Sequence, residues 1–290
     1  MSGDQQLKLK FAVHAYAWTS SWSNDELHLI DHAKELGLDA IEIPLMEPEL
    51  VDPRAIKERL ESVGLGVCTS VALSEAADPS SEDPEIRRNG LEFLKRCIRL
   101  TAEMGGSVFT GVTYSAIGRR IRRRPNEDDW RRSAEVLKEA ARYAQSMGVT
   151  LGIEPINRYE TFLINTAEQG IKLMRMIDEP NVGIHLDAYH MNIEETDFYE
   201  ATKMAVPYLV HYHLSESHRG IPGRGRVDWD GIFRALGEAQ YDGLVGLESF
   251  AEISEAMLPA TCIWRDLAPS SDELVVEGLK FLKQTAAKYY

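Results

Sequence analysis

Four polar residues stand where short apolar runs of the sequence end: Glu154 after TLGI, Asp187 after VGIHL, His213 after LVHY and Glu248 after LVGL. Three carboxylates near one point repel each other and resist ionisation unless a cation lies among them. Three carboxylates with one imidazole are typical ligands of Mn²⁺, Mg²⁺ or Co²⁺, whereas structural zinc sites are rich in sulfur. These residues therefore predict a divalent metal site, provided that the fold brings the four segments together.

A repeated pattern in the chain supplies such a fold. In AKELGLDAIEI, LESVGLGVCTS, TAEMGGSVFTG and AQSMGVTLGIE, an amphipathic stretch stops at a glycine and a short apolar run follows. Glycine beyond a helix end adopts the left-handed cap conformation, so each unit is predicted to be a helix, a cap and a strand. The clearest helix start is Asp52-Pro53, a capping side chain followed by proline at the first helical position.

Eight strands alternating with eight helices must pair in parallel, and in a chain of 290 residues they predict a single (β/α)₈ TIM barrel domain over residues 1–290. A doubly wound open sheet is the structural alternative, but no predicted strand is followed by G-x-G-x-x-G or a P-loop. The predicted strands are 10–14, 40–43, 66–70, 107–111, 150–154, 182–187, 209–214 and 244–248. The predicted helices are 25–36, 53–63, 84–104, 127–147, 166–177, 197–206, 229–238 and 271–288.

In such a barrel the active site lies at the carboxyl ends of the strands, where the four polar residues are predicted to converge. Gly152 and Gly246 lie two positions before Glu154 and Glu248, so they leave inward room beneath each carboxylate. His185 and His211 lie two residues deeper than Asp187 and His213, where hydrogen bonding behind the ligands or core packing is expected rather than metal ligation. His14, at the end of the first strand, has no assigned role.

The composition excludes several classes of function. With 32 Lys and Arg against 46 Asp and Glu, the net charge is −14, which disfavours nucleic acid and anionic membranes as partners. No apolar run is long enough for a membrane span or a signal peptide, and three scattered cysteines are too few for a disulfide framework, so a cytoplasmic protein is expected. The run RRIRRRP at 119–125 suggests a site for phosphate or nucleic acid, but we favour a solvated loop or a subunit contact that balances nearby acids.

Five stretches of the chain, GIEPINRYE, HLDAYHMNIEE, HLSESHRGIPGRG, LVGLESF and IWRDL, resemble the ketose 3-epimerases. This family includes D-tagatose, D-allulose and L-ribulose 3-epimerases and lies within the xylose-isomerase-like barrels. The resemblance implies that Glu154, Asp187, His213 and Glu248 bind the metal and that Glu154 and Glu248 also act as acid and base. It further implies substrate contacts from Glu160, His190 and Arg219.

The reaction that the resemblance implies is epimerisation at carbon 3 of free ketoses through a cis-enediolate. The substrate pairs would be of the D-fructose/D-allulose, D-tagatose/D-sorbose or L-ribulose/L-xylulose type. One divalent ion per subunit is expected, Mn²⁺ first, with Co²⁺ or Mg²⁺ as alternatives. A homodimer or homotetramer is expected, with 251–267 as a contact surface, and Tyr16, Trp18 and Tyr114 are expected either to pack against the far carbons of a sugar or to belong to the core.

Other functions remain open from the sequence. Inosose isomerases or dehydratases and hydroxypyruvate isomerases of the same barrel group share the metal chemistry, and only loop residues separate them from a ketose epimerase. A sugar-binding module with a structural metal would need no acid and base. An abasic-site endonuclease would need additional His and Asp ligands and a basic groove, which 8 histidines and a charge of −14 disfavour.

Overall fold

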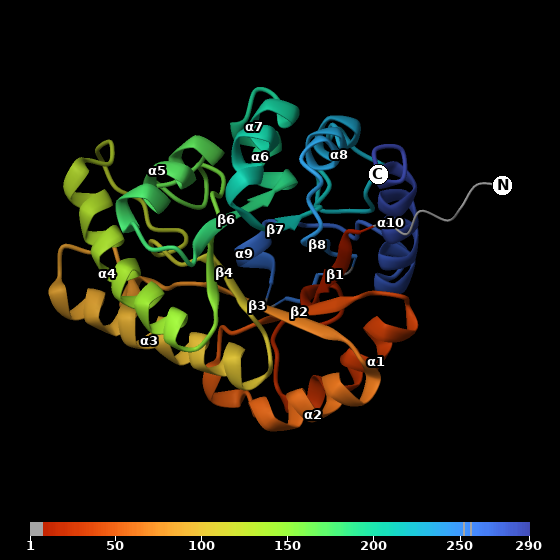
Figure 1. Cartoon of the computed structure of the whole chain (residues 1–290), viewed down its shortest axis with the longest axis horizontal. Helices are drawn as coiled ribbons and strands as arrows, with labels where there is room; N and C mark the ends of the chain where they lie inside the picture. The colour runs from red at the N-terminus through yellow and green to blue at the C-terminus, as the bar shows by residue number, and fades with distance from the viewer. Residues whose placement is uncertain (1–7, 252, 256) are drawn as a thin grey trace.

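The computed structural model describes residues 8–251, 253–255 and 257–290. Eight strands close into a barrel in which each strand pairs in parallel with the next along the chain and β8 pairs with β1 (Figure 1). The predicted barrel is therefore confirmed, and the open-sheet alternative is wrong. The strands are β1 (Lys10–His14), β2 (Ala40–Pro44), β3 (Gly66–Ala72), β4 (Val108–Val112), β5 (Thr150–Ile153), β6 (Val182–Asp187), β7 (Leu209–His213) and β8 (Leu244–Leu247).

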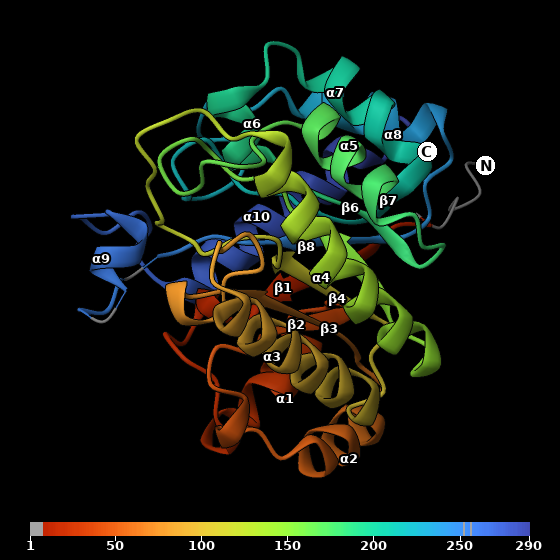
Figure 2. The same ribbon diagram turned by 90° about the vertical axis from the view of Figure 1, so that its left-hand side faces the viewer.

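Helices surround the barrel, as Figures 1 and 2 show. All eight predicted helices are present within a few residues of their expected bounds. They are α1 (His28–Glu35), α2 (Pro53–Val63), α3 (Pro84–Glu103), α4 (Glu127–Ser146), α5 (Ala167–Ile177), α7 (Phe198–Ala205), α8 (Trp229–Glu238) and α10 (Ser271–Ala286). Two short helices were not predicted, α6 (Ala188–Glu194) and α9 (Leu258–Thr261). In Figure 2, α9 lies at one edge of the molecule, apart from the other helices.

The predicted capping chemistry is present. The Asp52 side chain accepts hydrogen bonds from the backbone N–H groups of Arg54 and Ala55, and Pro53 begins α2. The same helix ends at Gly64, whose φ of 65° lies in the left-handed region that favours glycine. Local sequence therefore sets where α2 begins and ends, and its turn leads directly into β3.

The barrel interior contains a polar layer beneath the carboxyl ends of the strands. Glu42 of β2, His185 of β6 and His211 of β7 are all completely buried. Strand register places Glu42 beside His14 and Cys68, and His185 beside His211. A buried charge is costly unless it is paired. Glu42 is paired with His211 Nε2 at 2.8 Å, whereas His185 Nδ1 forms its hydrogen bond with Thr110 Oγ1 at 2.8 Å.

Two features bear on possible partners. Within residues 8–251, 253–255 and 257–290, no helix is both long and apolar enough to cross a membrane. In the arginine-rich run, Arg119 pairs with the buried Asp78 and Arg123 pairs with the buried Asp129, at 2.5 Å each. The expectation that this run balances nearby acids is confirmed for these two arginines, which connect the loop before α4 to the loop before α3 and to the first turn of α4.

Candidate metal centre

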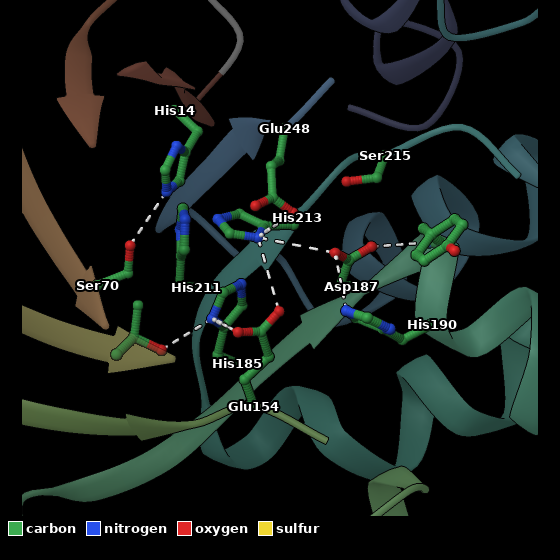
Figure 3. A network of polar contacts seen from close by, with 12 residues as sticks. His14, Ser70, Glu154, His185, Asp187, His190, His211, His213, Ser215 and Glu248 are labelled. Carbon is green, nitrogen blue, oxygen red and sulfur yellow. Dashed lines mark hydrogen bonds and ion pairs between the residues drawn. The ribbon is translucent and has the colours of Figure 1, made fainter. Parts of the chain in front are cut away.

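The four predicted ligands meet at the carboxyl ends of β5 to β8. The Nδ1 atom of His213 lies 3.7 Å from Glu154 Oε1, 3.8 Å from Asp187 Oδ2 and 3.2 Å from Glu248 Oε2 (Figure 3). Glu154, Asp187 and His213 each offer a ligand atom, and these three atoms lie within 4.8 Å of one another. The fold thus brings together in space four residues that span 95 positions of the sequence.

Strand register and two glycines create this convergence. Asp187 and His213 are direct neighbours in the β6–β7 pairing, so their side chains leave the sheet side by side. A Cβ atom at Gly152 would lie 2.5 Å from Thr110 Oγ1, and one at Gly246 would lie 2.9 Å from His211 Cε1. The inward room predicted beneath the two glutamates is therefore present, and a threonine and a histidine fill it.

The donor set fits a divalent cation. His213 Nδ1 is buried and has no hydrogen-bond partner among the described residues, although three carboxylates surround it. An imidazole nitrogen in that position either carries a proton or donates its lone pair to a cation. One nitrogen with several carboxylate oxygens suits a hard or borderline divalent ion.

Asp187 also makes the two structural contacts that would explain a strand-end acid without a metal. Its Oδ1 caps α6 by accepting a hydrogen bond of 2.7 Å from the Tyr189 N–H. Its Oδ2 accepts one of 2.8 Å from Arg219 Nη1, which also donates to Glu248 Oε2. The capping oxygen and the oxygen that faces His213 are different atoms, so the cap leaves Oδ2 directed at the centre.

Burial and neighbouring charges shift the pKa values of Glu154 and Glu248 in opposite directions. Burial raises the pKa of Glu154 well above its usual value, and Glu248 and Asp187 add to this rise although His213 opposes it. Burial also acts to raise the pKa of Glu248, but Arg219 and His213 outweigh it and hold that pKa well below its usual value. The surroundings therefore favour the protonated form of Glu154 and the ionised form of Glu248.

The predicted substrate residues Glu160, His190 and Arg219 line the same cavity. The Asn157 amide holds two of them, because Nδ2 donates to Glu160 Oε1 at 2.7 Å and the backbone N–H donates to His190 Nδ1 at 3.2 Å. The remaining nitrogen of His190, Nε2, faces Arg219 Nη2 at 3.3 Å. Burial lowers the pKa of His190, which favours the neutral ring.

The cavity has a volume of about 360 Å³ and opens at the carboxyl ends of the strands. Its lining includes apolar side chains from the loop after β2 and from the segment around α9, among them Met46, Met257 and Ile263. Of the three aromatic residues considered from the sequence, Tyr16 lines the cavity. Tyr114 is completely buried in the core, and the Trp18 Nε1 donates to Asp272 outside the cavity.

Sequence reasoning missed two residues of this region. Glu42 accepts hydrogen bonds from both His211 and His213, and an acid inside the apolar run AIEIP was the available signal. Asn157 belongs to the stretch NRYE, but its role depends on side chains that only the fold brings close. Arg158, in the same stretch, binds Glu194 through two nitrogen atoms at 2.9 Å each.

Comparison with known proteins gives a consistent result over the whole chain. Residues 30–285 match the model of the xylose isomerase-like TIM barrel family. The chain is 36% identical to the ketose 3-epimerase of Arthrobacter globiformis, over 97% of this chain and 98% of the relative. It is also 36% identical to the L-ribulose 3-epimerase of Methylomonas sp. strain DH-1, over 96% and 98% of the two chains. A crystal structure of D-allulose 3-epimerase from Methylomonas sp. in complex with D-allulose superposes with a TM-score of 0.91 at 35% identity, covering 96% of this chain and 97% of that one.

Proposed function

The chain belongs to the ketose 3-epimerases of the xylose isomerase-like TIM barrel family, an isomerase acting on sugars, and we propose that it epimerises carbon 3 of free ketoses with one divalent metal ion. The observation that carries this proposal is the buried Nδ1 of His213, which faces three carboxylates and has no hydrogen-bond partner among the described residues. Glu154, Asp187, His213 and Glu248 would hold the ion, for which Mn²⁺ is the first candidate.

Epimerisation requires removal of the proton on carbon 3 and return of a proton to the opposite face. A bound divalent ion would act as a Lewis acid that stabilises the negative charge developing next to the carbonyl. Glu154 and Glu248 lie on strands three places apart around the ring, so they reach a substrate between them from different sides. One carboxylate takes the carbon 3 proton while the other carboxyl gives its proton to the opposite face, and the roles exchange in the reverse reaction.

The remaining polar residues bind and orient the sugar. His190 Nε2 and the guanidinium of Arg219 donate hydrogen bonds to carbonyl and hydroxyl oxygens, and Glu160 accepts from a hydroxyl. The guanidinium is itself held by Asp187, Glu248 and the Tyr189 ring, whose centroid lies 4.1 Å from Cζ. These contacts fix the side chain at the edge of the metal centre.

Free ketoses suit the cavity better than phosphorylated ones. Among the described residues that line it, Arg219 is the only lysine or arginine, and two carboxylates already engage it. A phosphate group would therefore find no unpaired cation, whereas hydroxyl groups and an apolar carbon chain match the polar floor and apolar outer wall. The relatives named for L-ribulose and the D-allulose complex support the same class of substrate.

We also propose that the protein is a homodimer or homotetramer, with the segment around α9 at the contact. Trp264 is 72% exposed, and the neighbouring Ile263 lines the outer cavity wall. A large exposed aromatic side chain is typical of a protein interface. A partner that covers Trp264 would therefore also border the cavity entrance.

The test uses metal-stripped protein, Mn²⁺ and a panel of free ketoses in deuterated water. Deuterium at carbon 3 together with the epimeric product is expected, and only after the metal is added. Glu154→Gln and Glu248→Gln should fold but lose activity by a factor on the order of 10²–10⁴. Glu195→Gln is the matched control and should stay active, because Glu195 caps α5 and does not line the cavity. Label at another carbon, or turnover only of a sugar phosphate, inosose or hydroxypyruvate, would overturn the proposal.

A further inference from the structure

Glu42 is a carboxylate at the centre of the barrel that the proposed reaction does not use. It lies in the apolar strand β2 and is 0% exposed. Its Oε2 accepts hydrogen bonds from His211 Nε2 at 2.8 Å and from His213 Nε2 at 2.7 Å. A buried carboxylate without partners would be strongly destabilising, so two imidazole donors on one oxygen mark a specific arrangement.

The arrangement determines which nitrogen of His213 carries a proton. An ionised carboxylate can only accept hydrogen bonds, so Nε2 of His213 must be the donor in this pair. In the neutral ring, Nδ1 then has a free lone pair. That atom faces Glu154, Asp187 and Glu248 at 3.7, 3.8 and 3.2 Å. The hydrogen bond from Nε2 to Glu42 therefore also leaves Nδ1, on the other side of the ring, free to bind a cation.

Packing prevents His213 from choosing another orientation. Its ring lies edge-on to both His211 and His185, with centroids 4.9 and 4.1 Å away. His211 in turn lies against Gly246, where a Cβ atom would come within 2.9 Å of the ring. A third histidine, His14, brings Nε2 to 3.6 Å from Glu42 Oε1.

A metal site formed by Glu42, Cys68 and His211 is the competing explanation, since their ligand atoms lie within 4.8 Å of one another. The geometry argues against it, because the His211 nitrogen nearest Glu42 is already its hydrogen-bond donor. Burial and the neighbouring Glu42 also raise the pKa of the Cys68 thiol well above its usual value, which keeps the sulfur protonated. The cluster therefore supports the metal centre above it rather than forming a second one.

We propose that Glu42 is the positioning residue of the metal centre, which holds His213 in the tautomer and orientation that present Nδ1 to the divalent ion. This inference rests on the proposed function, because it assumes that His213 is a ligand. A carboxylate behind a ligating histidine fixes its ring and increases its basicity, and loss of such a partner typically weakens metal binding by about 10–100-fold.

The first test is metal affinity, measured by titration calorimetry of metal-stripped full-length protein with Mn²⁺. In Glu42→Gln a neutral amide group replaces the charged carboxylate whose Oε2 accepts from both imidazoles, so both hydrogen bonds lose their charge assistance. Binding weaker by about 10–100-fold is expected. Cys68→Ala is the matched control, because it removes the 3.8 Å neighbour of the same carboxylate without touching either histidine bond, and its affinity should stay within about threefold of wild type.

The second test reads the tautomer directly and does not depend on a variant of Glu42. Long-range ¹H–¹⁵N spectra of the Mg²⁺-saturated wild-type protein, assigned with His213→Gln, should show a slowly exchanging proton on Nε2 of His213 and none on Nδ1. Glu42→Gln affinity equal to wild type would overturn the role of Glu42 while the metal site stands. A proton on Nδ1 of His213 would overturn both the role of Glu42 and the assignment of His213 as a ligand. Failure of the wild-type protein to bind Mn²⁺ would instead overturn the proposed function itself.

Discussion

The substitution Gly246→Ala tests whether the position of His211, the second hydrogen-bond donor to Glu42, affects metal binding. The new Cβ atom would lie 2.9 Å from His211 Cε1 and 3.0 Å from its Nε2, well inside ordinary contact distance. His211 has little room to retreat, because Glu42 holds its Nε2 at 2.8 Å and the His185 ring lies 4.7 Å away between centroids. Overpacking of this kind costs about 1–3 kcal/mol of stability.

Displacement of the His211 ring should also move His213, because both rings donate to the same oxygen of Glu42. We therefore expect the affinity for Mn²⁺ to fall about tenfold, the lower end of the range for disturbed ligand support, which equals about 1.4 kcal/mol. Urea unfolding of the metal-free protein gives the stability term, and titration calorimetry gives the affinity. The two measurements together separate damage to the fold from damage to the centre.

Gly106→Ala is the matched control for this prediction. Its Cβ atom would also be crowded, with Thr101 Cγ2 at 3.1 Å and Val67 Cγ1 at 3.3 Å, but it lies before β4 at the other end of the barrel. We expect a loss of stability without a loss of metal affinity. The reasoning is refuted if Gly246→Ala binds Mn²⁺ as tightly as the wild type, or if the control weakens binding equally.

Three further predictions concern the loops around the centre. Hydrogen bonding to Arg123 lowers the pKa of the buried Asp129. The ionised carboxylate therefore stabilises the folded protein fully above about pH 4, and this contribution is lost as the pH falls through the lowered pKa. Asp129→Asn should reduce the free energy of unfolding in urea by about 1.5–3 kcal/mol at pH 7 and by progressively less below pH 4. Glu216→Gln disturbs a buried carboxylate that accepts five hydrogen bonds within the loop carrying Arg219, so trypsin should cleave this loop faster, and an unchanged cleavage rate contradicts the role. Trp264→Glu should sediment as a smaller species than the wild type, and a wild-type protein that sediments as one chain refutes the contact.

The fold could be predicted because its signals are local. Each helix–strand unit carries its own cap and its own apolar run, and the Asp52-Pro53 start and Gly64 end of α2 depend on neighbours within the chain. The two missed helices show the limit of such signals. The helix α6 follows directly after Asp187, a residue already assigned to the metal centre, so no separate start signal marks it. The helix α9 is only four residues long.

The candidate site could be predicted only in part. Strand-end residues reveal themselves because parallel strands bring all their carboxyl ends to one face, so Glu154 and His213 could be assigned from position alone. Arg219 shows what position leaves out: its φ of 64° and its contacts with Asp187 and Glu248 follow from a loop whose course depends on Glu216. Contacts of that kind join segments far apart in the chain, and no repeated pattern in the sequence indicates that they meet.

Glu42 is the strongest example, because its partners lie 169 and 171 positions away in the chain. An acid in an apolar strand is costly to bury, and such a residue persists only where several donors converge on it. Here one donor is His213, a predicted ligand, and the other is His211, two positions before it on β7. The contacts that offset the cost of burying Glu42 therefore also orient His213. The barrel interior should therefore tolerate Cys68→Ala more readily than Glu42→Gln, although the alanine removes more atoms than the amide changes.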